Sequence, residues 1–141
     1  LKVAEISTYY FGTLSVGFNN ARQTEEIHNS IIISKGEKIP CQRTSEFQTM
    51  YENQTAIRCR VTKSGSPETD PRFVSVVWEG ELELPEDRPA GQIVKVTYSF
   101  DENGMMQCEF LDVESGRETK IQLDNNQDSA GSSEIDKFLV D

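Results

Sequence analysis

The sequence has few of the side chains that enzymes use for catalysis. One histidine, His28, and three cysteines occur among 141 residues. A Ser-His-Asp or Cys-His arrangement is hard to assemble from so few groups, and the chain has neither a glycine-rich phosphate loop nor a GxSxG elbow. The many carboxylates gather in turn-like stretches such as 79–81 and 85–87, where they favour solubility. We therefore expect a domain that is not itself an enzyme.

Basic side chains are also scarce. The chain has 14 Lys and Arg residues against 24 Asp and Glu residues, a net charge of -10. This deficit argues against nucleic acid and anionic membranes as partners, because both are bound through clustered cations. The cysteines Cys41, Cys59 and Cys108 form an odd set without metal-ligand spacing, which argues against a disulfide framework or a zinc site and suits a reducing cytosol. No apolar run approaches the roughly 20 residues that cross a bilayer. We expect a soluble, cytoplasmic domain.

Short segments rich in β-branched and aromatic residues recur between turn signals. This pattern is typical of an all-β domain, and we predict a two-layer antiparallel β-sandwich. The predicted strands are Tyr9–Phe18, Asn29–Ser34, Phe47–Thr49, Ala56–Thr62, Glu81–Leu84, Ile93–Phe100, Met105–Leu111 and Lys120–Leu123.

Turn and linker signals divide the chain. Hairpin turns are predicted at Asp101–Gly104 and at Ser115-Gly116, with a mobile loop over 63–72 and a second loop over 85–91. The sandwich is expected to occupy residues 1–123. Residues 124–132 are polar and form a predicted linker, and residues 133–141 show the cap and apolar spacing of a helix that is just beginning.

Four segments carry a family resemblance in their order and spacing. Residues 14–21 read LSVGFNNA, residues 39–57 read IPCQRTSEFQTMYENQTAI, residues 95–105 read KVTYSFDENGM and residues 115–118 read SGRE. They resemble the LSLGIETA, IPT…F-x-T…DNQ, EVTFDIDANGI and TGKENKI segments of one domain. That domain is the peptide-binding domain of the heat shock protein 70 chaperones. The resemblance runs from about 14 to 123 and continues weakly from residue 133, where the family has a helical lid.

The resemblance implies a chaperone of the stress response. The domain would hold extended apolar segments of unfolded polypeptides under the control of an upstream ATPase domain. ATP and magnesium would bind in that upstream domain, and no cofactor is expected in this one. Cochaperones are implied as further partners. Self-association is also expected, because residues 139–140 or 1–6 could occupy a neighbour's groove as a substrate would.

The resemblance also implies which residues bind the peptide. An apolar pocket accepts one large side chain, polar groups contact the peptide backbone, and an arch closes over the peptide. The pocket residues would be Phe18, Phe47, Ile57 and Cys59; the polar contacts Asn19, Asn20, Gln48 and Gln54; the arch Ala21 and Met50; and Thr49 lies in the same segment. By composition alone, Phe18, Phe47 and Ile57 would be ordinary sandwich core.

The sequence departs from the family pattern in the arch. Arg22-Gln23 stand where the family has two glycines, and the stretch up to Ile31 is a few residues longer. Asn19 replaces an acidic groove residue, and Cys59 replaces an apolar pocket residue. These departures define a divergent member and keep a second hypothesis open. The same fold could serve as an interaction or regulatory module that no longer binds peptides generically. A third hypothesis, an unrelated adhesion or carbohydrate-binding sandwich, would require coincidental matches.

Overall fold

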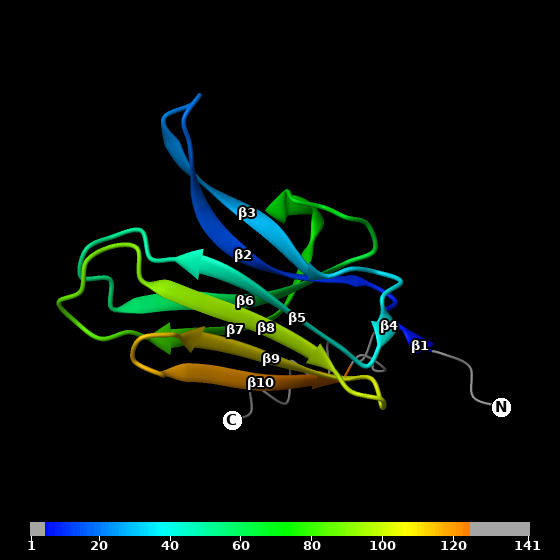
Figure 1. Ribbon diagram of the computed structural model, residues 1–141. Helices are drawn as coiled ribbons and strands as arrows, with labels where there is room; N and C mark the ends of the chain where they lie inside the picture. Colours follow the sequence, from blue (N-terminus) through cyan, green and yellow to red (C-terminus); the bar gives the residue numbers. More distant parts are fainter. Residues whose placement is uncertain (1–4, 125–141) are drawn as a thin grey trace, which may run out of the picture.

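The described part of the chain consists mostly of β-strands joined by turns and loops. The computed structural model describes residues 5–124 and is shown in Figure 1. In chain order the elements are β1 (Glu5–Ile6), β2 (Tyr10–Asn19), β3 (Thr24–Ile33), β4 (Lys38–Ile39), β5 (Cys41–Gln48), β6 (Ala56–Ser64), the short 3-10 helix η1 (Pro71–Phe73), β7 (Ser75–Glu83), β8 (Ile93–Phe100), β9 (Met105–Asp112) and β10 (Glu118–Asp124).

Two antiparallel sheets of four strands pack face to face. One has the order β10-β9-β8-β5 and the other the order β3-β2-β6-β7, while β1 and β4 pair as a small separate sheet. The predicted all-β sandwich is therefore confirmed. The predicted helix start at 133–141 lies outside the described residues, as does most of the predicted linker.

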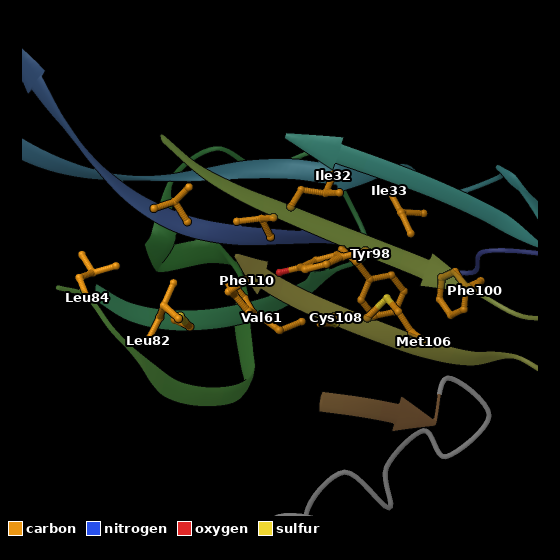
Figure 2. Close-up of a cluster of buried hydrophobic side chains, with 14 residues drawn as sticks. Ile32, Ile33, Val61, Leu82, Leu84, Tyr98, Phe100, Met106, Cys108 and Phe110 are labelled. Atoms are coloured by element: carbon orange, nitrogen blue, oxygen red, sulfur yellow. The ribbon is translucent and has the colours of Figure 1, made fainter. Parts of the chain in front are cut away.

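The core is built by alternate residues of the strands. In β8 and β9 every second side chain is buried, which is the pattern of strands with one face on a core. Figure 2 shows the ring of Tyr98 lying among apolar side chains of both sheets. Its hydroxyl donates a hydrogen bond to the Gly12 carbonyl oxygen at 2.7 Å, so a buried polar group is satisfied and β8 is tied to β2.

Each long strand of the structure was predicted, but several predicted ranges are shorter than the observed strands. The prediction for Ile93–Phe100 is confirmed to the residue. The largest errors are β3, which begins at Thr24 and not Asn29, β5, which begins at Cys41 and not Phe47, and β7, which begins at Ser75 and not Glu81. These added stretches are rich in polar or charged residues, or lie on edge strands, and pairing with a neighbour makes them strands despite weak local patterns.

The predicted hairpin turns are confirmed. Gly104 and Gly116 adopt positive φ of 82° and 79°, a conformation that glycine takes without strain. The Asp101 carboxylate accepts hydrogen bonds from the amides of Asn103 and Met105, which stabilises the first turn. The loop predicted over 63–72 is shorter than expected, because β6 continues to Ser64 and η1 begins at Pro71.

A buried ion pair joins a loop to the end of strand β9. Arg88, in the loop before β8, donates two hydrogen bonds to the Asp112 carboxylate at 2.9 and 3.0 Å. The Asp112 side chain is 0% exposed and that of Arg88 is 11% exposed. Arg88 also contacts Glu114 at 3.0 Å, and Ser115 donates to Asp112, so the carboxylate is almost fully bonded.

Candidate functional site

The sheet β3-β2-β6-β7 splits along its middle. β2 pairs with β6 only from Tyr10↔Ser64 to Thr13↔Val61, whereas its pairing with β3 continues to Asn19↔Thr24. On the other side, β6 stays paired with β7 as far as Ala56↔Glu83. In Figure 1 the β2–β3 hairpin accordingly rises away from the rest of the sandwich. Beyond Thr13, the facing edges of β2 and β6 have no strand partner among the described residues.

A cavity of about 260 Å³ lies where the two strands part. Its wall combines the inner residues of β2, the start of β6, the loop between β5 and β6, and apolar core residues of the opposite sheet. The lining residues are Thr13, Leu14, Ser15, Val16, Glu25, Phe47, Gln48, Met50, Tyr51, Gln54, Ala56, Ile57, Arg58, Arg60, Val94, Val96 and Phe110. The cavity therefore offers an apolar interior next to two strand edges that have no partner strand among the described residues.

Five of the predicted site residues meet at this cavity. Phe47, Gln48, Met50, Gln54 and Ile57 all contribute to its lining. Phe47 and Ile57 are half-buried and also pack against the core. Each of these two residues therefore both lines the cavity and belongs to the edge of the sandwich core. The β5–β6 loop, which carries Met50 and Gln54, is thus placed at the cavity mouth.

Gln54 organises that loop. Its side-chain oxygen accepts hydrogen bonds from the amides of Met50 and Tyr51 at 3.0 and 3.3 Å. Its side-chain nitrogen donates to the Ala56 carbonyl oxygen at 3.3 Å. Because both ends of the amide are engaged within the loop, Gln54 shapes the cavity mouth in addition to lining it.

The predicted residues of the β2–β3 hairpin lie outside the cavity lining. These are Phe18, Asn19, Asn20 and Ala21. The Phe18 ring is 50% exposed near the tip of the hairpin. Asn19 accepts a hydrogen bond from the Arg22 amide and donates to Glu26, which lowers the pKa of the Glu26 carboxyl. The longer hairpin thus extends these groups beyond the cavity and uses Asn19 for its own turn.

Two other predicted residues are buried in the sandwich. Cys59 is 1% exposed in the core, and burial raises the pKa of its thiol to about 12. Thr49 is buried as well, and its hydroxyl accepts a hydrogen bond from the Gln92 amide at 2.9 Å. Both residues support the walls of the site and do not line the cavity.

A hydrogen bond across the cavity mouth joins two residues, Tyr51 and Glu25, that were not selected from the sequence. The hydroxyl of Tyr51, in the β5–β6 loop, donates to the carboxylate of Glu25 in β3, and both side chains line the cavity. This hydrogen bond raises the pKa of Tyr51. Where the family resemblance implied an arch of Ala21 and Met50, a polar contact between Tyr51 and Glu25 connects the two sides here.

Sequence reasoning also missed the two arginines of the cavity wall. Arg58 and Arg60 alternate with Ile57 and Cys59 along β6. Because residues two apart in a strand share a face, the sequence could have indicated that the two arginines lie together. The core residues Val94, Val96 and Phe110 belong to the opposite sheet, and no local signal in the sequence brings them to this site.

The described residues show no metal centre or membrane helix. Within residues 5–124, no group of three or more His, Cys, Asp or Glu side chains could hold a metal ion. The helical part of that same range contains nothing long and apolar enough to cross a bilayer.

Comparison with known proteins identifies the family. A family profile described as "Hsp70 protein" matches residues 13–141. The chain belongs to the Hsp70 family. It is 27% identical over 109 residues to a "heat shock protein homolog" of Encephalitozoon cuniculi, and 26% identical over 114 residues to a "heat shock 70 kDa protein" of Trichophyton rubrum. These matches cover 76% and 78% of the chain but only 16% and 17% of the two relatives.

Membership of the Hsp70 family supports a chaperone-related function for the chain. The chain spans about one sixth of the length of these relatives, so most of each relative lies outside the matched region. Low identity agrees with the divergence noted in the hairpin between β2 and β3.

Proposed function

We propose that this Hsp70-family domain holds extended segments of other polypeptides in the cavity between β2 and β6. One observation carries the proposal. The cavity is bordered by two strand edges that lack a partner strand within residues 5–124, and its interior is lined by apolar residues of both sheets. An extended segment could satisfy those edges through its own backbone, as peptides do when they add to a sheet.

The expected mode of binding combines two contributions. Hydrogen bonds to the backbone do not depend on sequence, so they tolerate many segments. One large apolar side chain would enter the cavity beside Phe47 and Ile57, and burial of a Leu-sized group contributes about 1.5 to 3 kcal/mol. These contributions suit weak, reversible capture in the micromolar range.

The proposal extends to the whole protein. We propose that an ATPase domain with ATP and magnesium controls this domain, and that cochaperones in the cytosol act with it. This domain would itself be without enzymatic activity and without a cofactor. The support is family membership together with the large part of each relative that lies outside the match.

The test is a titration with a fluorescent heptapeptide that has a central Leu. Saturable binding in the micromolar range is expected by anisotropy, and Ile57→Phe should weaken it at least tenfold by filling the cavity. Trp78 supplies a second signal, because its ring stacks on Phe110, which lines the cavity, with centroids 6.1 Å apart.

Val76→Phe is the matched control for that substitution. Val76 is on β7 of the same sheet, 44% exposed and outside the cavity lining, so the added ring should not affect binding. No saturable binding at high micromolar peptide, with a folded domain, would overturn the proposal.

One observation favours a second function, that of an interaction module which does not grip peptides. Val16, Phe18 and Ile27 leave an apolar surface exposed on the hairpin, and Val16 pairs directly with Ile27. Such a surface could dock a folded partner. This reading predicts no heptapeptide binding and weaker partner binding in Phe18→Ser.

A further inference from the structure

Arg60 is a cation in the cavity lining that has no carboxylate partner in the described part of the chain. Its Nε is buried and makes no hydrogen bond with any described residue. Across residues 5–124 no carboxylate lies within ion-pair distance of its guanidinium, although Glu79 faces it across the β6–β7 ladder. The side chain is half-buried, so water replaces only part of the missing contacts.

The other arginines nearby have carboxylate partners. Arg58, two residues earlier on β6 and also in the lining, reaches Glu79 at 3.6 Å and is mostly exposed. Arg88 is bonded to both Asp112 and Glu114. Arg60 therefore stands apart as a lining cation whose charge is not balanced by the described part of the chain.

The buried Nε of Arg60 has lost its hydration without gaining a hydrogen bond from the described residues, and such a loss costs free energy. A carboxylate brought in by a bound segment would restore the lost hydrogen bonds, and hydrogen bonds between two charged groups are stronger than those between neutral groups. The gain arises only when the guest carries the anion, so it distinguishes one guest from another.

From this arrangement, and resting on the proposed peptide binding, we infer that the site selects extended segments with an acidic residue near the apolar one. Arg60 is the specificity-determining residue, and Asp or Glu of the guest is its partner. The substrate class is thus an apolar side chain flanked by a carboxylate.

The strand geometry gives the spacing. Arg60 is three residues beyond Ile57 on β6, which corresponds to about 10 Å at the usual rise of a strand. A guest that runs along the same edge and buries its apolar side chain beside Ile57 would bring an acidic residue to Arg60 at a separation of about three residues.

The overall charge of -10 opposes acidic guests at long range. At physiological ionic strength, however, charges farther apart than about 8 Å are largely screened, whereas a direct contact with Arg60 is not. Glu25 is the carboxylate in the cavity lining, and it already accepts a hydrogen bond from Tyr51. The local preference can therefore oppose the charge of the whole domain.

Three heptapeptides test the inference. Each has a central Leu, with Asp, Asn or Lys at both the first and the last position, so that either direction of binding brings the flanking group toward Arg60. We expect the Asp peptide to bind about fivefold more tightly than the Asn peptide and the Lys peptide more weakly than both. The ratio of the Asn to the Asp dissociation constant, expected to be about five, is the measured quantity.

Arg60→Gln should bring that ratio to about one, and Arg60→Lys should keep the preference. Arg43→Gln is the control, because Arg43 is an exposed β5 arginine outside the lining and should leave the ratio at about five. A ratio of one in the wild type, with all peptides bound, would overturn the acidic preference and leave the proposed function standing. Absence of binding for every peptide would overturn both.

Discussion

The two sheets of the sandwich carry the same number of strands and differ in continuity. In the sheet β10-β9-β8-β5, β5 and β8 pair over the whole length from Cys41↔Phe100 to Gln48↔Ile93. In the sheet β3-β2-β6-β7, the pairing of β2 with β6 stops at Thr13↔Val61, and a cavity opens beyond it. One sheet thus supplies a rigid wall, and the interrupted sheet supplies the site.

The same difference appears in two arginines. Arg88, in the loop before β8 of the continuous sheet, has its Nη groups bonded to the buried Asp112 at the end of β9 and to the exposed Glu114. Arg60, at the break in the other sheet, has no described partner. The charge of Arg88 is thus balanced by carboxylates of the fold, whereas we propose that a guest balances the charge of Arg60 at the break.

The largest expected effect on stability comes from the ion pair beside the continuous sheet. Asp112→Ala leaves Arg88 buried without its main partner and should lower the free energy of unfolding by about 3 kcal/mol. Urea unfolding followed by Trp78 fluorescence measures it. Glu114→Ala removes a 70% exposed carboxylate from the same arginine and should cost less than about 1 kcal/mol. Equal losses of unfolding free energy in the two variants would contradict the claim that the burial of Asp112 makes its ion pair the stronger one.

The pH dependence gives an independent check on Asp112. Burial raises its pKa, but the hydrogen bonds from Arg88 and Ser115 outweigh burial, and the net shift is downward. A lowered folded pKa means that the pair stabilises the domain above the unfolded value of about 3.9 and that this contribution is lost as the pH falls further. The difference between wild type and Asp112→Ala should therefore narrow below about pH 4.

A second substitution tests the point where the sheet divides. A Cβ at Gly12 would lie 2.4 Å from the Ser30 carbonyl oxygen, a backbone atom that cannot move aside. Gly12→Ala should lower the free energy of unfolding by about 2 kcal/mol. Gly17→Ala, on the same strand, meets the His28 side chain at 3.3 Å and should stay within about 0.5 kcal/mol of wild type. Similar losses for both would rule out the backbone clash as the cause.

The smallest effect is expected at the cavity mouth. Tyr51→Phe removes the hydrogen bond to Glu25 and should leave the urea midpoint unchanged while peptide dissociation becomes about two- to threefold faster. Glu25→Gln should have a similar effect, and the double variant should add little to either one, because both changes remove the same contact. Additive effects in stopped-flow dissociation would show that the two side chains act separately.

Much of the fold could be predicted from local patterns. Alternation located the strand Ile93–Phe100 to the residue, and turn residues located the Asp101–Gly104 hairpin. The start of β3 at Thr24 could not be predicted this way, because its charged residues become a strand only through pairing with β2.

The site was predictable only where its residues lie close together in the chain. In the segment from Phe47 to Ile57, five of the residues selected from the sequence line the cavity. Phe18, Asn19, Asn20 and Ala21 were assigned by the same family resemblance, but the structure places them on the hairpin, outside the lining. The length of this hairpin changes their position without altering the motif that suggested them.

The sequence by itself determined the acidic all-β domain, its turns and the family to which it belongs, because these depend on composition, alternation and short motifs. Only the tertiary structure decided where β2 leaves β6, that Tyr51 meets Glu25, and that Arg60 has no described partner. Each of these depends on contacts between residues far apart in the chain, whose register is set by packing across the two sheets and not by any local preference.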